Sequence, residues 1–437
     1  MKINVIGAGL AGCEAAWQIA NLGYEVKLFD MKPGKFSPAH KNKNFAELVC
    51  SNSLKAQRVD SAAGLLKEEM KCFGSLLIEC AYKCSVPAGG ALAVNRELFS
   101  LMVTEKIKSN PLIEVIESEI FDINLDDINV IATGPLTSDI FEKKISQLCN
   151  GLLSFYDAAA PILTTESIDM SEVFYASRYD KGDDNAYINC PMNKEQYDLF
   201  YDELVNAERA PIQDFDVMNP KVYDGCMPIE VMAQRGHDTL RFGPLKPVGL
   251  IDPKTGRRPW AVVQLRCENA EATLYNMVGF QTNLKFGEQK RVFSMIPALK
   301  NAEFIRYGVM HRNTFIDSPR VLNQDFSMKN YPKIFFAGQI TGVEGYMESA
   351  SSGLLAGINA VNRLKGLNTL CLPRETMMGA LSYYISDESV KNFQPMGANF
   401  GILPSIEPHI KDKKQRYMEF SKRSLIKLNN IINKVRK

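Results

Sequence analysis

The chain has 437 residues, of which 46% are hydrophobic and 23% are charged, and its formal net charge is +1. A single hydrophobic core seldom serves so long a chain, so we expect two domains. No stretch approaches the roughly 20 apolar residues that a membrane helix needs. The charge balance is also unlike that of a strongly basic nucleic-acid-binding domain. The composition therefore predicts a globular protein with no membrane span, in which any contact with nucleic acid is local.

Folded structure is expected almost from the first residue. Lys2 to Ile6 is a short apolar strand and a turn begins at Gly7, which leaves no room for a signal peptide. We therefore expect the protein to remain in the cytoplasm. The ten cysteines form no CxxC pair and are expected as free thiols in that reducing compartment. The four histidines show neither HxxxH nor HExxH, so no metal site is predicted.

A glycine-rich turn of the form GxGxxG joins the first strand to a helix expected from Cys13 to Asn21. Its residues are Gly7, Ala8, Gly9, Leu10, Ala11 and Gly12. In this motif the first glycine makes the tight turn, the second admits a pyrophosphate, and the third lets helix and strand pack closely. A second strand, Tyr24 to Phe29, leads to Asp30, where a carboxylate is placed to bind a ribose hydroxyl. The pattern predicts a dinucleotide-binding site.

Two later strands end in glycine in the same way. Ile128 to Ala132 leads to a turn at Gly134, and Lys333 to Ala337 leads to Gly338, with a helix expected from about Ser349 to Leu364. Ligands of open α/β sheets lie beyond the carboxyl ends of the strands. The three exits are therefore expected to converge on one extended cofactor.

The exit at Gly338 and Gln339 favours FAD as that cofactor. FAD, NAD and S-adenosylmethionine all use glycine-rich turns, but a long cofactor needs two holding points. In many flavoproteins the C-terminal strand ends in Gly-Asp beside the ribitol. Here Gln339 takes the acidic position, and its amide is able to bind a hydroxyl without a charge. An ordinary turn between strand and helix is the alternative interpretation.

The sequence changes character between about Ser171 and Lys300, where short strands and loops rich in Pro, Gly, Asn and aromatic residues follow one another. We predict an α/β fold: a Rossmann-like FAD-binding domain of the glutathione-reductase type, interrupted by a smaller α+β insertion domain. The expected boundaries are 1–170 and 306–437 for the FAD-binding domain and 171–305 for the insertion.

Two cysteines adjoin turn-forming residues, unlike the others. Cys50 lies in FAELVCSNS and Cys226 in YDGCMP. Backbone N–H groups at a turn or helix start stabilise a thiolate and bring its pKa below the ordinary value of about 8.5. From spacing alone, a buried structural cysteine remains the simpler interpretation of each.

Long segments of the chain resemble the folate- and flavin-dependent tRNA (uracil-5-)-methyltransferases, the TrmFO family. They are GAGLAGCEAAW from Gly7, SPAH from Ser37, FAELVCSNSLK from Phe45, SVPAGGALAV from Ser85, YDGCMPIE from Tyr223, RFGPLKPVGL from Arg241, YGVMHRNTF from Tyr307 and FQPMGANFGIL from Phe393. The resemblance implies FAD as cofactor, 5,10-methylenetetrahydrofolate as one-carbon donor and NADH or NADPH as reductant. The implied reaction methylates C5 of a uridine in the T loop of tRNA, forming ribothymidine.

The same resemblance implies roles for the two cysteines. Cys226 matches the family cysteine proposed to add to C6 of uracil, which creates an enolate able to attack a methylene carbon. Cys50 matches a second cysteine near the flavin, suggested to assist removal of the C5 proton. The target base lies in a folded loop and must be exposed or flipped to reach Cys226.

Two further expectations concern folate and RNA. Some relatives have histidine at the position of Asn283, stacked on the pterin, and asparagine does not stack in this way, so that contact is not carried over. An RNA target implies a surface that recognises shape. The candidate cations are Arg241, Lys246, Arg257, Arg258 and the basic tail from Lys411 to Lys437, with solvated charge as the alternative.

Three alternative functions stay open. The first is the same chemistry on a uridine of 23S rRNA, and the second is a flavin-containing RNA-binding protein without turnover. The third is the wobble-uridine modifying flavoprotein, which has a similar glycine-rich opening but normally a long C-terminal helical domain that this chain is too short to contain. Neither a membrane nor DNA is expected as a partner.

Overall fold

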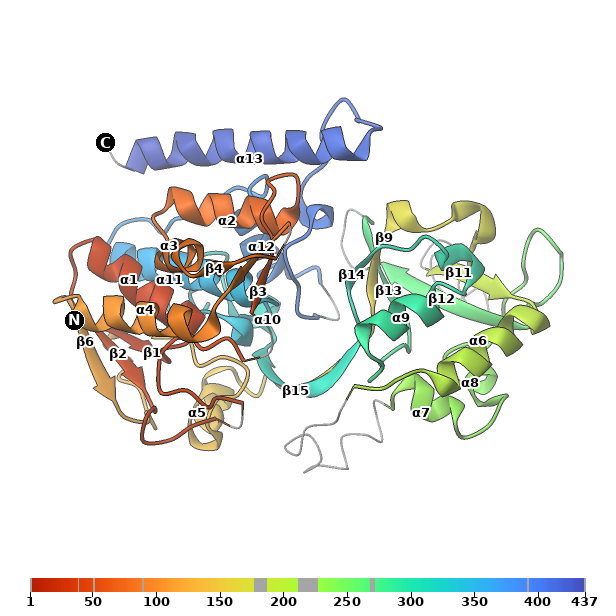
Figure 1. The fold of residues 1–437 in the computed structure, drawn as a ribbon, viewed down its shortest axis with the longest axis horizontal. Coiled ribbons are helices and arrows are strands. Elements are labelled where there is room, and N and C mark those ends of the chain that lie inside the picture. The colour runs from red at the N-terminus through yellow and green to blue at the C-terminus, as the bar shows by residue number, and fades with distance from the viewer. Residues whose placement is uncertain are drawn as a thin grey trace. The chain divides into compact units, whose positions relative to one another are not determined.

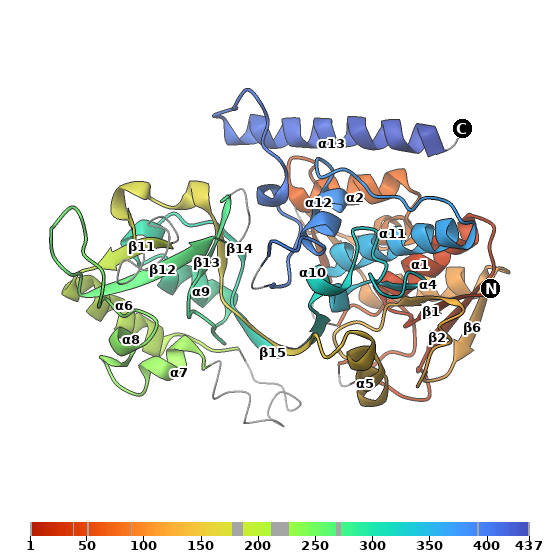
Figure 2. The same ribbon diagram turned by 180° about the vertical axis from the view of Figure 1, so that it is seen from behind.

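The computed structural model shows a chain folded into two compact units (Figures 1 and 2). It describes residues 2–37, 39–49, 52–88, 90–176, 187–210, 227–267, 272–390 and 393–435. The first unit contains Met1–Phe155 and Asn313–Lys437, and the second contains Tyr156–Arg312. The expected insertion at 171–305 lies inside the second unit. The strands at the two crossings, β8 (Leu153–Ala159) and β15 (Val309–Ile316), pair in a two-stranded sheet.

A five-stranded parallel sheet forms the centre of the first unit. Its order is β16 (Ile334–Phe336), β7 (Ile128–Ile131), β1 (Ile3–Ile6), β2 (Val26–Asp30) and β6 (Ile113–Glu117). Strands β1, β7 and β16 are almost wholly buried, as parallel sheets covered on both faces require. The four strands expected from the sequence are present, whereas β6 was not predicted. The predicted α/β class with a Rossmann-like parallel sheet is confirmed.

Two helices pack closely beside this sheet, α1 (Leu10–Asn21) and α11 (Tyr346–Leu364). A Cβ added at Gly353 would lie 2.1 Å from the carbonyl oxygen of Ala11. The two backbones therefore approach so closely that only glycine fits at this point. This contact holds the start of α1 beside the C-terminal part of the chain.

Further helices and a small sheet complete the first unit. The helices are α2 (Ala62–Cys72), α3 (Leu76–Lys83), α4 (Arg96–Ser109), α5 (Asp139–Leu148), α10 (Ser318–Val321), α12 (Met377–Tyr384) and α13 (Lys413–Val435). The small antiparallel sheet has the order β3 (Ser53–Ala56), β5 (Ala91–Val94), β4 (Ser85–Val86). In both ribbon views α13 lies along α2 (Figures 1 and 2). None of the described helices is long and apolar enough to cross a membrane.

The second unit is built on a six-stranded antiparallel sheet. Its order is β10 (Phe174–Tyr175), β11 (Tyr187–Met192), β12 (Ala261–Cys267), β13 (Leu274–Met277), β9 (Ile162–Thr164), β14 (Phe304–Arg306). Its helices are α6 (Lys194–Asn206), α7 (Ile229–Ala233), α8 (Thr239–Phe242) and α9 (Phe286–Phe293). Buried aromatic side chains of α6, α9 and the loop after β13, among them Phe200, Phe280 and Phe293, join one core with the sheet. The unit therefore has its own hydrophobic core, as an α+β insertion requires.

Candidate functional site

The glycine-rich turn between β1 and α1 contains two glycines that the protein's own packing requires. Gly7 has φ of 101°, and a Cβ at this position would lie 2.5 Å from the carbonyl oxygen of Ala132. A Cβ at Gly12 would lie 1.7 Å from the carbonyl oxygen of Gly7. Any side chain at either position would displace backbone, so both glycines are explained without a ligand.

Gly9 differs from these two glycines. Its φ is −74°, which every residue adopts, and a Cβ here would meet no atom within 4 Å. Nothing in the protein therefore demands glycine at this point. The first turn of α1 also contains no acidic residue and has no side-chain cap, so its N–H groups and its dipole are available to an anion. These features fit the close approach of a pyrophosphate, and the residues present fit a dinucleotide cofactor.

Asp30 lies at the end of β2 and holds the turn. Its Oδ2 accepts a hydrogen bond of 2.7 Å from the N–H of Ala8, and its Oδ1 accepts one of 2.8 Å from the N–H of Lys32. A carboxylate has about four lone-pair positions. Two therefore remain for a ribose hydroxyl, and that role stays a prediction.

Gly338 and Gln339 follow β16 and lie beside the start of α1. Gly338 has φ of 84°, donates its N–H to Ser352 Oγ at 2.7 Å, and a Cβ there would lie 3.1 Å from the Cβ of Ala11. Gln339 opens a short 3-10 helix, Gln339–Thr341. Because β16, β7 and β1 are neighbouring parallel strands, the exits at Gly338, Gly134 and Gly7 lie along the same edge of the sheet.

The two proposed catalytic cysteines, Cys50 and Cys226, lie outside the described residues. The eight described cysteines are free thiols. Burial raises the pKa of Cys80 to about 12 and also raises that of Cys149 to about 12. Such thiols stay protonated at neutral pH and behave as small apolar side chains.

Asn283 has a structural partner that the sequence did not indicate. Its side-chain Nδ2 donates to the carbonyl oxygen of Ala210 at 3.2 Å, and its backbone oxygen accepts from the N–H of Ala210 at 2.7 Å. The buried carboxylate of Glu230 accepts from the N–H of Asn283 at 2.8 Å and from the Thr282 hydroxyl at 2.7 Å. Asn283 therefore links Ala210 to Glu230 of α7.

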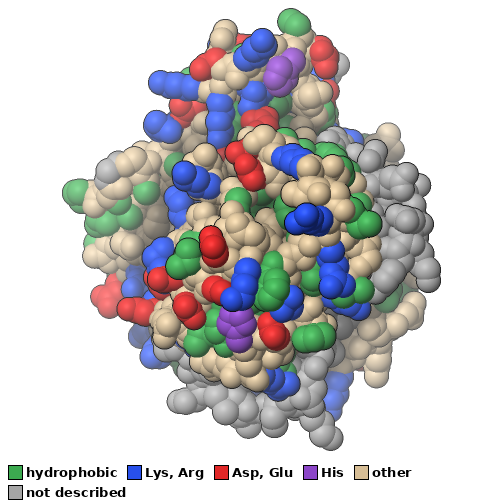
Figure 3. Space-filling model, turned by 90° about the vertical axis from the view of Figure 1, so that its right-hand side faces the viewer, with side chains coloured by type: hydrophobic (Ala, Val, Ile, Leu, Met, Phe, Trp, Pro, Cys, Tyr) green, Lys and Arg blue, Asp and Glu red, His purple; other side chains and the backbone are tan. Residues whose placement is uncertain are grey.

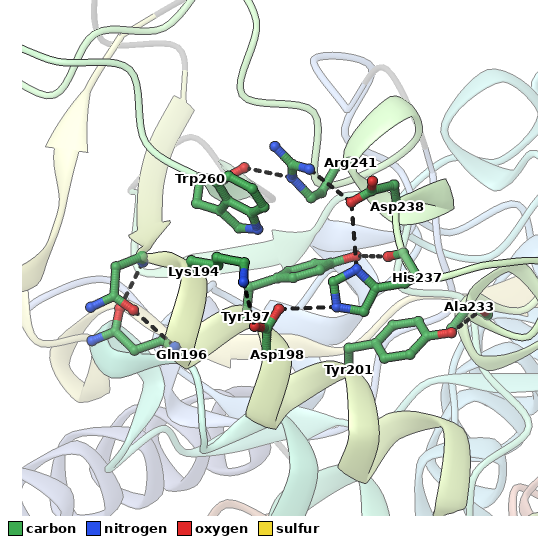
Figure 4. A network of polar contacts seen from close by, with 11 residues as sticks. Lys194, Gln196, Tyr197, Asp198, Tyr201, Ala233, His237, Asp238, Arg241 and Trp260 are labelled. Atoms are coloured by element: carbon green, nitrogen blue, oxygen red, sulfur yellow. Dashed lines mark hydrogen bonds and ion pairs between the residues drawn. The ribbon is translucent and has the colours of Figure 1, made fainter.

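A polar and aromatic cluster lies between α6, α8 and the start of β12 in the second unit (Figure 4). His237 Nε2 is 3.0 Å from Asp198 Oδ1, and its ring meets Tyr201 edge to face. The guanidinium of Arg241 lies 3.7 Å above the centre of the Trp260 ring and bonds to Asp238 Oδ1 at 2.7 Å. The guanidinium of Arg241 therefore already has partners within the protein, so Arg241 is a weaker candidate for binding an RNA phosphate.

The other candidate cations differ in availability. Arg257 and Arg258 are exposed and have no ion pair with any described residue. In the tail, by contrast, Arg416 is buried, and Arg423 donates to the carbonyl oxygens of Pro404 and Ser405. In the space-filling view of Figure 3, Lys and Arg side chains are scattered among hydrophobic, Asp and Glu side chains on the face shown. In the tail helix α13, Arg416 and Arg423 thus contribute to packing within the first unit.

The fold and the glycine turn together indicate the class of protein to which this chain belongs. The parallel sheet and glycine turn define a dinucleotide-binding α/β protein. The family model described as "Glucose inhibited division protein A" matches residues 2–368. This covers most of the chain, including the three glycine exits at Gly7, Gly134 and Gly338.

Full-length relatives narrow the class further. The "Methylenetetrahydrofolate--tRNA-(uracil-5-)-methyltransferase TrmFO" of Acetivibrio thermocellus is 60% identical over 433 residues, 99% of each chain. The proteins of that name from Ligilactobacillus salivarius and Caldicellulosiruptor bescii are each 57% identical, covering 99% and 100% of this chain and 98% and 100% of theirs. The chain belongs to the TrmFO family.

Proposed function

We propose that this protein is a methylenetetrahydrofolate- and FAD-dependent tRNA (uracil-5-)-methyltransferase of the cytoplasm. The observation that carries the proposal is 60% identity, over 99% of both chains, with a relative of that name. The glycine turn supports the flavin part, because Gly9 leaves open space where the packing itself needs no glycine. NADH or NADPH is the proposed reductant, since reduced flavin must be regenerated in each turnover.

The first unit supplies the proposed FAD site. The N–H groups at the start of α1, at Leu10, Ala11 and Gly12, would bind the pyrophosphate, and Asp30 would accept a hydrogen bond from a ribose hydroxyl. Gly338 and Gln339, beside α11, would hold the other end of the cofactor. When bound, FAD supplies the electrons that turn a transferred methylene group into a methyl group.

Cys226 is the proposed nucleophile and Cys50 the proposed assistant in proton removal. Addition of the Cys226 thiolate to C6 of uridine makes C5 nucleophilic, and loss of the C5 proton later restores the aromatic base. Both roles rest on the family resemblance of their segments. Cys80 and Cys149 are poor alternatives, because burial raises the pKa of both thiols.

The second unit carries a basic turn that suits RNA phosphates. Between Arg235 and Arg258 there are six Lys or Arg and two Asp, a net charge of +4 in a chain whose total is +1. The turn is held by backbone bonds, from the N–H of Asp252 to the oxygen of Arg257 at 3.0 Å and from Gly256 to Asp252 at 2.8 Å. Phe242, nearby in sequence, is 83% exposed, as a side chain for base stacking would be.

The test is transfer of a labelled methylene group from 5,10-methylenetetrahydrofolate to RNA by the purified yellow protein with NADPH. We expect label in C5 of a T-loop uridine of unmodified tRNA and none with S-adenosylmethionine as donor. Label found only in 23S rRNA would favour the ribosomal alternative. A Cys226→Ala variant that retains FAD should lose methylation. Methylation at the normal rate by this variant would contradict the proposed nucleophile.

A further inference from the structure

The loop between α8 and β12 contains a tight hairpin, residues 250–258, and the loop projects from the second unit in both ribbon views (Figures 1 and 2). The base of the hairpin is anchored by Leu250, which is buried and packs with Phe174 and Val262 in a small hydrophobic cluster. The next residue, Ile251, is by contrast 64% exposed. A large apolar side chain is therefore held in solvent directly beside a buried anchor.

Asp252 braces the hairpin from within. It is 8% exposed, and its Oδ1 accepts from the N–H of Lys254 at 2.9 Å. Its backbone N–H donates to the carbonyl oxygen of Arg257 at 3.0 Å, and its carbonyl oxygen accepts from the N–H of Gly256 at 2.8 Å. Gly256 has φ of 65°, in the left-handed region that favours glycine. The chain's own hydrogen bonds thus fix the backbone from which Ile251 extends.

The other side chains exposed on this hairpin include three cations, Lys254, Arg257 and Arg258. Neither arginine has an ion pair with any described residue. Guanidinium groups bind phosphates well, and proteins that distort nucleic acids insert apolar side chains, isoleucine among them, between base steps. The combination of exposed arginines with one exposed isoleucine on a braced hairpin therefore favours RNA as its partner.

The proposed reaction needs a group that keeps the RNA open. A uridine in a folded loop must leave the base stack before a nucleophile can reach C6, and this step costs the stacking energy of the base. The departing base also leaves a gap between its neighbours. An apolar side chain that enters the gap replaces part of the lost contact and hinders the return of the base.

We propose that Ile251 is a wedge that enters the base stack of the tRNA T loop as the target uridine leaves it, while Arg257 and Arg258 bind neighbouring phosphates. The wedge rests on the tRNA methylation proposed above. Ile251 touches no reacting atom and is a positioning residue. Because phosphate contacts supply most of the affinity for RNA, loss of the wedge should slow the opening of the stack more than it weakens binding.

Two variants test the wedge: Ile251→Ser removes the apolar side chain, and Ile251→Leu keeps one of similar volume. The probe is a T-arm stem-loop with 2-aminopurine next to the target uridine, whose fluorescence rises when the stack opens. With the full chain carrying FAD, the wild type and Ile251→Leu should give this rise and Ile251→Ser should lose it. In single-turnover methylation we expect Ile251→Ser to be on the order of tenfold slower, with a Kd for RNA within about threefold of the wild type.

A second RNA separates the wedge from a merely structural role. When the nucleotides on both sides of the target uridine are abasic, there is no stack to open at that point. On this RNA the Ile251→Ser variant should methylate as fast as the wild type, a rescue that a folding defect would not allow. Leu199→Ser, an equivalent exchange at a leucine of α6 that is 62% exposed, is the matched control and should equal the wild type on both RNAs.

Three results would overturn the inference. The first is a fluorescence rise and a methylation rate in Ile251→Ser equal to those of the wild type. The second is loss of the rise in Phe242→Ser alone, which would assign the wedge to Phe242. The third is a wild-type dimer in sedimentation that Ile251→Ser dissociates, because a second copy would then cover Ile251.

The same experiments distinguish failure of the wedge from failure of the function on which it rests. Wild-type protein with bound FAD that methylates no tRNA would contradict the proposed function. Wild-type protein that methylates the T-loop uridine, with an equally active Ile251→Ser variant, would contradict only the role of Ile251.

Discussion

Exchange of Glu69 for glutamine should change how the stability of the first unit depends on pH. Glu69, on α2, is wholly buried and accepts from the N–H groups of Met377 at 2.6 Å and Met378 at 2.8 Å and from the Ser424 hydroxyl. Burial outweighs these bonds and raises the pKa of its carboxyl from 4.5 to about 7. Between these two values the folded state holds a proton that the unfolded state has released, so the free energy of unfolding falls as pH rises.

The size of this effect follows from the shift. A difference of 2.5 pH units at about 1.4 kcal/mol per unit gives a loss of about 3 kcal/mol between pH 4.5 and pH 7 and little further change above it. Glu69→Gln does not titrate, so the variant should gain about 3 kcal/mol relative to the wild type over this interval. The amide also leaves one N–H donor unpaired, a cost of about 1–3 kcal/mol that does not depend on pH.

Urea unfolding of both proteins at intervals from pH 4.5 to pH 8 measures the difference. The same exchange at Glu25, which is exposed, is the control and should reproduce the wild-type profile. Parallel curves for the wild type and Glu69→Gln would show that the carboxyl does not change its proton affinity on folding, and the reasoning would be wrong.

Three other predictions concern the cofactor site and the second unit. Gly9→Ala should fold normally yet bind FAD at least tenfold more weakly, about 1.4 kcal/mol, because the added methyl group would meet only the ligand. Gly12→Ala should instead destabilise the apoprotein, since its Cβ would lie 1.7 Å from a backbone oxygen. Equilibrium dialysis measures the first effect and thermal unfolding the second, and an unchanged FAD affinity in Gly9→Ala would refute the first prediction. Replacing Arg257 and Arg258 by alanine should weaken tRNA binding and reduce its salt dependence by about two charges, as measured by filter binding at several salt concentrations; an unchanged slope would exclude phosphate contacts here. Glu230→Gln should destabilise the second unit by about 1–3 kcal/mol, because one of two buried donors loses its acceptor, and urea unfolding that matches the wild type would contradict this.

Local patterns predicted the parallel core because its signals lie within a few residues of each other. The strand before Gly7, the helix ending at Asn21 and the strand ending at Asp30 are each mostly apolar and lie beside a turn residue. The edge strand β6 (Ile113–Glu117) was missed because only its first residue is fully buried. A half-exposed strand has weak hydrophobic periodicity, and its pairing with β2 is a property of the folded sheet.

The candidate site, too, was predicted only in part from the sequence. The spacing of Gly7, Gly9 and Gly12 identified the turn, but only atomic positions separated the glycines required by packing from the one that is not. From the sequence, Arg241 was a candidate phosphate contact. Its stacking on Trp260 and its bond to Asp238 could not be predicted, because the stacking depends on how α8 packs beside the start of β12.

By itself the sequence determined the glycine turn, the strands that surround it and the family to which the chain is similar, because these depend on residues close together or on long matching segments. The tertiary structure decided that Gly338 lies against Ala11, and that Lys55 meets Glu348 although 293 positions separate them. Hydrophobic periodicity records whether a residue is buried but not which distant residue it meets. Contacts of this kind exist only after β3, α2 and α11 have packed around one core.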